Sequence, residues 1–345
     1  MVKHLYIHIP FCESICSYCD FCRFVSNVQT KKKYIEKVVM QIKSKFDVHN
    51  KLDSIYIGGG TPNSLSQDLL HTLLCECKKF CKKNTEFTIE CNPEFVNDKQ
   101  IKVFKKYKIN RVSLGVQSTN NALLKRINRK HTYEDVVNAV KLLQKNKIKN
   151  ISCDFIYGFN ETTKKELDDA LAFISKYSIP HYSFYSLETK PNSLITKQGY
   201  SINIEKQEKD LQYIEKKSKY TRYEVSNWCK NKKYESVHNK AYWLTKEWCG
   251  IGLSACGFEN HTMYENVGDL NNWKKKSSKK LSTRDYYFQI LMMGLRLVNG
   301  IDLKDKNVLN AFNYYKNKLK HYHIKNNHLV ANNVNTLNEC LVDCL

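Results

Sequence analysis

Three cysteines near the start of the chain have a spacing that suits metal binding. Cys12, Cys16 and Cys19 form the pattern CxxxCxxC directly after a segment that reads as a strand. Three thiolates can hold three irons of a [4Fe–4S] cluster and leave the fourth iron free to bind the amine and carboxylate of a small molecule. Zinc sites more often pair one CxxC with a second CxxC or with histidines, and no such pair follows. The pattern therefore predicts a [4Fe–4S] cluster, with zinc as the alternative.

The composition of the chain bears on where it works. It has 14 cysteines in 345 residues, no apolar run near the length of a membrane span and no signal-peptide pattern at its start. We therefore expect a cytoplasmic protein. Cysteines stay reduced in that compartment, so a close group of them indicates a metal site rather than disulfides.

The elements that must position these cysteines alternate between strand and helix. We expect strands at 5–9, 54–57, 87–91, 111–116, 151–157 and 181–187. Apolar spacing predicts helices at 34–46, 65–80, 98–107, 133–143 and 164–176. Repeated strand–helix units build a parallel sheet with helices outside it, and right-handed crossovers curl that sheet. The sequence thus predicts an α/β fold with a partial (β/α)6 TIM-like barrel.

Glycines and polar residues gather at the carboxyl ends of these strands. The triplet 58–60 and Thr61 follow the second strand, Glu90 and Gln117 end the third and fourth, and Asp154 lies in the fifth. Barrels carry their sites at this edge. Glycines let a ligand approach the backbone closely, and a carboxylate can accept hydrogen bonds from ribose hydroxyls. A turn, a helix cap or a core ion pair would explain the same residues structurally.

Arg129 and Asp154 carry charges that need partners. The paired donors of a guanidinium suit a carboxylate ligand, although Arg129 would also be acceptable as a surface residue. Asp154 stands between Cys153 and Phe155, where a lone charge is costly. Both are candidates for the site.

The residues around the cysteines resemble the radical S-adenosylmethionine superfamily. The strings LYIHIPFC at 5–12 and YCDF at 18–21 are similar to the group of oxygen-independent coproporphyrinogen III oxidases and HemW haem chaperones. The resemblance implies a cluster on Cys12, Cys16 and Cys19, with S-adenosylmethionine as second cofactor. It also implies S-adenosylmethionine contacts from Tyr6, Tyr18, Gly59, Gly60, Thr61, Glu90, Gln117, Arg129 and Asp154.

The residues after the third cysteine separate the branches of this group. The oxidases typically carry CxxxCxxCxC, whereas Phe21 stands at the last of those positions here and Cys22 comes one residue later. The CDF form is typical of the chaperones. A fourth protein thiolate would block S-adenosylmethionine, so we expect that Cys22 is not a ligand.

A second motif lies in the distal half. The run HNKAYW at 238–243 resembles the HNxxYW marker of the chaperones. Histidine can ligate haem iron and two aromatic rings can cover a porphyrin face, which makes His238, Tyr242 and Trp243 haem candidates. From the residues alone, His238 would more readily be a polar residue that fixes its loop, with the two aromatic residues in the core.

The resemblance leaves two main functions open, with a radical enzyme for another substrate as a third option. The first is a haem chaperone that binds a [4Fe–4S] cluster, S-adenosylmethionine and haem and delivers haem to acceptor proteins. The second is a coproporphyrinogen III oxidase, a radical enzyme that oxidatively decarboxylates porphyrinogen propionates with an external electron donor. HNxxYW and CDF favour the chaperone. We expect three segments: a radical barrel at 1–200, a HemW-type segment at 201–282 and a short, mostly helical, winged-helix-like appendage at 283–345.

The chain is strongly basic, with 56 Lys and Arg against 34 Asp and Glu, a net charge of +22. Lys and Asn are spread throughout, and no basic-aromatic groove pattern accompanies the charge, so we expect no nucleic-acid partner. The charge is compatible with binding of porphyrin propionates and with peripheral contact to an anionic membrane.

Overall fold

The computed structural model describes residues 2–277 and 280–344, so the first and last residues of the predicted outer segments lie outside it. Six strands, β1 to β6, run parallel in sequence order and form the centre of one large sheet. Their bounds are His4–Ile9, Leu52–Gly59, Cys81–Cys91, Arg111–Gln117, Asn150–Tyr157 and His181–Ser186. This confirms the predicted α/β fold with a partial parallel barrel.

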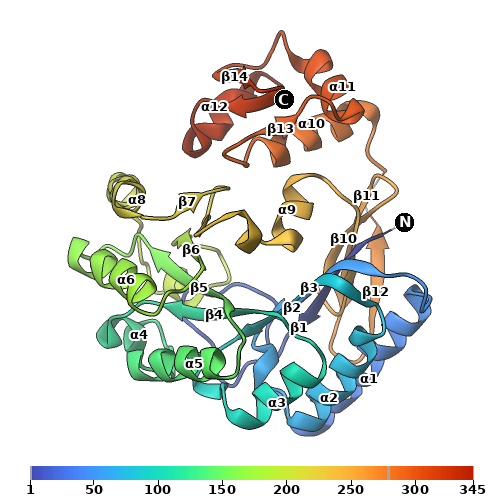
Figure 1. Ribbon diagram of the computed structural model, residues 1–345, viewed down its shortest axis with the longest axis vertical. Helices are drawn as coiled ribbons and strands as arrows, with labels where there is room; N and C mark the ends of the chain where they lie inside the picture. Colours follow the sequence, from blue (N-terminus) through green and yellow to red (C-terminus); the bar gives the residue numbers. More distant parts are fainter. Residues whose placement is uncertain (1, 278–279, 345) are drawn as a thin grey trace.

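Helices cover the outer face of these strands (Figure 1). They are α1 to α8, at Val28–Lys45, Gln67–Lys78, Asp98–Lys106, Asn121–Arg126, Tyr133–Lys145, Lys164–Lys176, Leu194–Lys197 and Ile204–Lys217. Local sequence fixes their starts: α5 and α6 begin with capping boxes, Thr132 with Asp135 and Thr163 with Glu166. The apolar residues of α1, α2, α3, α5, α6 and α8 pack on outward-facing strand residues in the main buried cluster, whereas those of α4 and α7 belong to a smaller separate cluster.

The sheet extends beyond the six central strands on both sides. Its order is β12-β11-β10-β9-β1-β2-β3-β4-β5-β6-β8-β7, with β9 parallel to β1 and β8 antiparallel to β6. These flanking strands are β7 to β12, at Thr221–Arg222, Asn227–Cys229, Trp248–Ile251, Cys256–Glu259, Thr262–Gly268 and Trp273–Ser277. The aromatic and glycine-rich segment of the sequence thus completes both edges of the barrel.

The inner face of the barrel is polar. Along β4, Val112, Leu114 and Val116 belong to the main buried cluster, whereas Ser113 and Gly115 line a cavity inside. Side chains alternate between the two faces of a strand, so one strand supplies both the core and the site.

A C-terminal unit has a buried cluster of its own and lies beyond one end of the barrel (Figure 1). Its helices are α10 (Thr283–Gly294), α11 (Lys306–Tyr315) and α12 (Leu337–Leu341). They pack with a three-stranded sheet, β13-β15-β14, whose strands are Ile301–Asp302, His328–Ala331 and Tyr322–Lys325. The predicted helical appendage is confirmed, with this small sheet in addition.

The helix α9 (Val237–Trp243) lies between the barrel and the C-terminal unit (Figure 1). His238 packs inside the barrel, where its ring stacks on Tyr56 at 5.1 Å, while Trp243 packs on the C-terminal cluster. Among the described residues, none of the helices has the length and apolar character needed to cross a bilayer.

Candidate functional site

The three predicted cluster cysteines lie on the loop between β1 and α1. The Cys12 N–H donates to the Phe24 carbonyl (3.0 Å), which joins the two ends of the loop. The Cys19 N–H donates to the Cys16 carbonyl (3.3 Å) and closes a tight turn. All three cysteines are free thiols and line one cavity of about 520 Å³, which we call the cluster cavity.

Hydrogen-bond donors point at two of these sulfurs. The Thr61 hydroxyl donates to Cys12 Sγ (3.5 Å), and Arg129 Nη1 donates to Cys16 Sγ (3.6 Å). Such donors favour thiolates, the form that binds iron. Burial raises the pKa of Cys19 to about 11, so iron would have to displace its proton. Within the described residues no three His, Cys, Asp or Glu side chains are grouped to hold a single metal ion. Three sulfurs around one cavity, with donors aimed at them, fit a cluster held by thiolates.

The glycine triplet after β2 lies directly against the cysteine loop. A Cβ at Gly60 would stand 2.7 Å from the Phe11 carbonyl oxygen and 3.0 Å from Cys12 Sγ. Gly59 has a φ of +117°, and a Cβ there would meet the His8 ring at 2.7 Å. Glycine is required at position 60 by the close approach of the cysteine loop and at position 59 by the positive φ and the nearby His8 ring. The cluster cavity is therefore bordered here by backbone rather than by side chains.

Glu90 lies in the cavity with both carboxylate oxygens engaged. Oε1 accepts from the Tyr56 hydroxyl (2.8 Å) and Oε2 from the Gly59 N–H (3.0 Å). Burial, with a contribution from Asp154, raises the pKa of Glu90 to about 7, although both hydrogen bonds oppose the shift. The group is therefore half-protonated near neutral pH.

The titration of Glu90 predicts a pH-dependent affinity for S-adenosylmethionine. Ribose hydroxyls donate best to the carboxylate, so affinity should rise with pH up to about 7, by at most roughly tenfold per unit, and then level off. Calorimetric titration of the anaerobically reconstituted protein between pH 6 and 8 measures this. Glu90→Gln should flatten the profile and weaken binding roughly tenfold at high pH. As a control, Glu188→Gln, at the exposed rim, should keep the wild-type dependence of affinity on pH. If Glu90→Gln also keeps that dependence, Glu90 does not contact the ligand.

Asp154 is held by a set of hydroxyl groups. It accepts hydrogen bonds from Ser113 (2.7 Å), Ser183 (2.8 Å) and Ser152 (3.1 Å). Burial raises its pKa, and the hydroxyls, together with the charge of Arg111, pull it down again. This half-buried carboxylate thus has polar partners and still faces the cavity.

Arg129 is fixed beside the cysteine loop. Its Nη2 donates to the Gly115 carbonyl and to Asn92 Oδ1, both at 2.9 Å. Gln117, at the end of β4, has a φ of +65°, where a residue other than glycine is strained. The pairing of β4 with β5 shifts at the same place. Strain of this kind collects at binding sites.

The cluster cavity brings together eleven of the twelve residues that we predicted for cluster and S-adenosylmethionine. Besides Cys12, Cys16 and Cys19, its lining includes Tyr18, Gly59, Gly60, Thr61, Glu90, Gln117, Arg129 and Asp154.

Tyr6 is the twelfth, and it does not line the cavity. Its hydroxyl donates to His8 Nδ1 (2.9 Å), and His8 Nε2 donates to the Cys22 carbonyl (3.0 Å). Tyr6 therefore supports the loop from behind, and its direct contact with a ligand stays a prediction.

The Cys22 side chain is absent from the lining as well and packs against the main buried cluster, in keeping with its expected exclusion from the ligand set.

The three haem candidates lie away from the cluster cavity. His238 is buried, its Nδ1 is bonded to the Ser54 hydroxyl and its Nε2 to the Tyr242 hydroxyl, both at 2.7 Å. Burial lowers the pKa of His238 to about 3, so the ring stays neutral. Trp243 lies under Arg296, 5.7 Å from the guanidinium carbon. In this arrangement both ring nitrogens of His238 already have partners, and haem ligation by this motif stays a prediction.

Several residues of the cavity were not predicted from the sequence, namely Tyr56, Ser113, Tyr185 and Ser226. Neither was Ser183, which lies beside the cavity and donates to Asp154. A signal was present for most of them. Period-two alternation places Tyr56 on the face of Gly58, and Ser113 on the face of Gly115, so polar residues at these positions point inward.

Comparison with known proteins places this geometry in a family. Residues 6–174 match the Radical SAM superfamily. The chain is 34% identical to the heme chaperone HemW of Lactococcus lactis subsp. lactis (strain IL1403), over 86% of this chain and 82% of that protein. It is 29% identical to HemW of Bacillus subtilis (strain 168), over 88% and 86%. The solved coproporphyrinogen III oxidase HemN of Escherichia coli matches with a TM-score of 0.77 at 16% identity, over 98% of this chain and 87% of that one, a likeness of fold.

The superfamily match begins in β1 and spans the strands that carry the cysteines and the glycine triplet. The HemW match continues through α9 and covers most of both chains. The chain belongs to the HemW family of the radical SAM superfamily.

Proposed function

We propose that this protein is a haem chaperone that binds a [4Fe–4S] cluster and S-adenosylmethionine at the cluster cavity and delivers haem to acceptor proteins. The observation that carries the proposal is the meeting of three free cysteines with Glu90 and Asp154 in one cavity, in a chain whose relatives are named heme chaperones. The cluster and S-adenosylmethionine, when bound, supply one-electron chemistry that side chains cannot.

The residues of the cavity have separate tasks in this proposal. Cys12, Cys16 and Cys19 hold the cluster. The close approach of Gly59 and Gly60 offers backbone groups to the methionyl end of S-adenosylmethionine, and Glu90 accepts from the ribose hydroxyls. Arg129, Gln117, Asp154, Thr61 and Tyr18 complete the S-adenosylmethionine contacts, with Tyr6 behind them.

The proposal extends to the surroundings of the protein. We place it in the cytoplasm, where an electron donor can reduce the cluster and thiols stay reduced. The net charge of +22 allows peripheral contact with an anionic membrane, where an acceptor could be met.

Anaerobic reconstitution with iron and sulfide, followed by haem or coproporphyrinogen III together with S-adenosylmethionine and reductant, tests the function. We expect about one haem per chain in the Soret band and no decarboxylated porphyrin. Turnover to the divinyl product would identify an oxidase, the activity named for HemN. Failure of the wild-type protein to bind haem would reject the chaperone function.

A further inference from the structure

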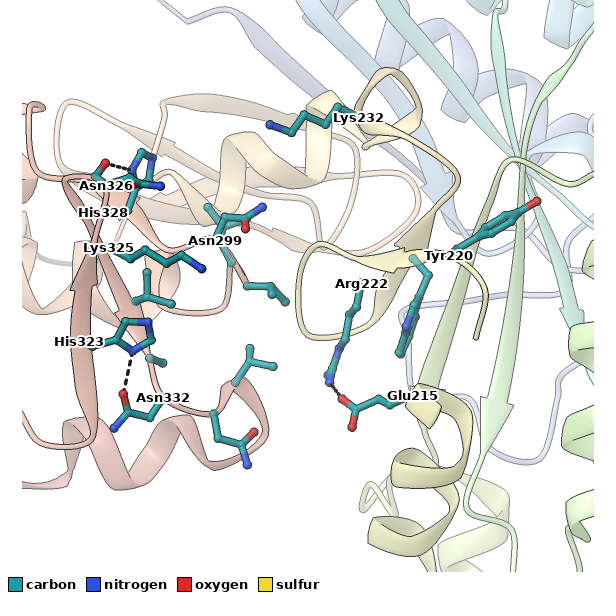
Figure 2. Close-up of a pocket in the computed structure, with 17 residues that line it drawn as sticks. Glu215, Tyr220, Arg222, Lys232, Asn299, His323, Lys325, Asn326, His328 and Asn332 are labelled. Atoms are coloured by element: carbon teal, nitrogen blue, oxygen red, sulfur yellow. Dashed lines mark hydrogen bonds and ion pairs between the residues drawn. The ribbon is translucent and has the colours of Figure 1, made fainter. Parts of the chain in front are cut away.

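The histidine of the HNxxYW motif is enclosed inside the barrel. His238 is 1% exposed, and its two ring nitrogens are bonded to the hydroxyls of Ser54 and Tyr242. None of the motif's residues is among the described residues that line the cluster cavity or the groove of about 850 Å³ between the barrel and the C-terminal unit, which Figure 2 shows. Neither cavity therefore brings a porphyrin against this ring, and any effect of His238 must pass through its neighbours.

His238 is anchored on the two strands that lead to Glu90. Its N–H donates to Glu86 Oε1 of β3 (2.9 Å), and its Nδ1 is bonded to Ser54 of β2 (2.7 Å). Ser54 and Glu86 pair with each other across these strands. Side chains two positions apart share one face of a strand, so Tyr56 and Glu90, farther along the same strands, also point inward. His238 thus stands at one end of a row of side chains that leads to the cluster cavity.

Ring stacking transmits the position of His238 to Tyr56. The two ring centroids lie 5.1 Å apart, with an angle of 26° between the ring planes. The ring of Tyr6 also lies near Tyr56, at 6.2 Å. Stacked neighbours restrict the rotamers that a tyrosine can adopt. The Tyr56 hydroxyl is thereby held where it donates to Glu90 Oε1 (2.8 Å).

The contact between Tyr56 and Glu90 is the one that depends on side-chain packing. The other donor to Glu90 is the Gly59 N–H (3.0 Å), which belongs to the backbone of β2 and is fixed by the strand. Gly58 leaves space for the carboxylate, since a Cβ there would stand 2.8 Å from Glu90 Cδ. A change at His238 would therefore reach Glu90 through the phenol of Tyr56.

We propose that His238 is a positioning residue of the S-adenosylmethionine pocket, whose ring holds Tyr56 against Glu90, and that it does not ligate haem iron. The inference rests on the proposed function, because it concerns the cofactor site of that function. Tyr242 has a place in the same arrangement, since its hydroxyl is bonded to His238 Nε2 (2.7 Å) and fixes the orientation of the ring. The motif thus acts on a cavity that it does not line.

Calorimetric titration of the anaerobically reconstituted full chain with S-adenosylmethionine, between about pH 6 and 8, tests the inference. We expect His238→Ala to bind roughly tenfold more weakly at pH 7 and to gain affinity above pH 7, where the wild-type affinity levels off. The reason is that a hydrogen bond to the charged form lowers the pKa of a carboxylate. Loss of the Tyr56 hydroxyl therefore raises the pKa of Glu90 further.

Tyr56→Phe removes that hydroxyl alone and should give the same shifted dependence on pH. Other titratable groups whose charges act on Glu90 are unchanged in both variants, namely Asp154, Tyr6, Tyr185, Tyr242 and Cys91. A change in the pH dependence that both variants share is thus assigned to the Tyr56 hydroxyl.

His238→Phe separates positioning from ligation. Phenylalanine keeps a ring against Tyr56 but has no nitrogen for iron, so S-adenosylmethionine affinity and haem affinity should both match the wild type. The matched control is His71→Ala, which removes an imidazole bonded to the hydroxyl of Tyr107 (2.7 Å) on the outer helix α2. It should leave both affinities and the pH dependence unchanged. Circular dichroism and cluster loading show that each variant is folded.

The possible results separate this inference from the proposed function. Weaker S-adenosylmethionine binding with a shifted pH dependence in His238→Ala and Tyr56→Phe, at unchanged haem affinity, supports it. The wild-type pH dependence in folded His238→Ala would overturn it, whether affinity is retained or falls by one factor at every pH. Loss of haem in folded His238→Phe would also overturn it and assign the motif to the iron. If the wild-type protein fails to bind S-adenosylmethionine or haem, the proposed function itself fails.

Discussion

Cys16→Ala abolishes the iron–sulfur cluster while leaving the barrel folded. Each cysteine of the CxxxCxxC loop supplies one of only three protein thiolates, so the loss of one leaves two irons without ligands. After anaerobic reconstitution, we expect iron to fall from about four atoms per chain to near zero, with loss of the broad absorbance near 400 nm and of the reduced-state electron paramagnetic resonance signal. Cys12→Ala and Cys19→Ala should behave alike.

Cys22→Ala is the informative control for this experiment. Its thiol is only three residues from Cys19 and yet lies outside the cluster cavity, packed against the main core. It should keep the full iron content, as should Cys75→Ala, whose thiol is exposed on α2. Loss of the cluster in Cys22→Ala, or its persistence in Cys16→Ala, would contradict the assigned ligand set.

Local pattern was sufficient to predict the central barrel. Each parallel strand from β1 to β5 contains apolar residues and is followed by a helix whose N-cap side chain is hydrogen-bonded, and both signals are local. The flanking strands β9 to β12 were not predicted. β9 pairs with β1, which is distant in sequence, and β10 pairs with β9. Because these strands depend on that distant pairing and on aromatic packing, no local sequence pattern predicts them. The C-terminal sheet was missed too, although β14 and β15 form a local hairpin whose two turn residues, Asn326 and Asn327, both have positive φ.

The part of the site that lies at the carboxyl ends of the parallel strands could be predicted from the sequence. The cysteines, the glycine triplet, Glu90 and Asp154 all lie at one edge because parallel strands end there. The residues that hydrogen-bond these side chains were harder to predict. Ser113 and Ser183 have no sequence pattern that marks them, because they meet Asp154 only through the pairing of neighbouring strands. His238 shows the opposite case. Its motif indicated a ligand, whereas its two hydroxyl partners come from Ser54, on another element, and from Tyr242.

Glu86→Ala destabilises the protein by roughly 3–5 kcal/mol, the range for breaking a buried ion pair on one side. Glu86 is buried, and its carboxylate accepts from the N–H groups of Val237 (3.0 Å) and His238 (2.9 Å) at the start of α9. It also stands 3.8 Å from the buried guanidinium of Arg111. Removing it leaves one cation and two helix donors without their acceptor. Urea unfolding of the reduced, metal-free protein measures the change.

A surface pair and a double variant test the cause of this loss. Asp53→Asn removes the carboxylate of an exposed pair with Lys82 and should change the free energy of unfolding by less than about 1 kcal/mol. Glu86→Leu/Arg111→Leu should be less destabilised than Glu86→Ala, because no unpaired charge stays buried. If Glu86→Ala unfolds at the wild-type urea concentration, the pair does not hold α9. If the double variant is stable but binds haem poorly, the pair serves to place α9, and with it the C-terminal unit, rather than to stabilise the barrel.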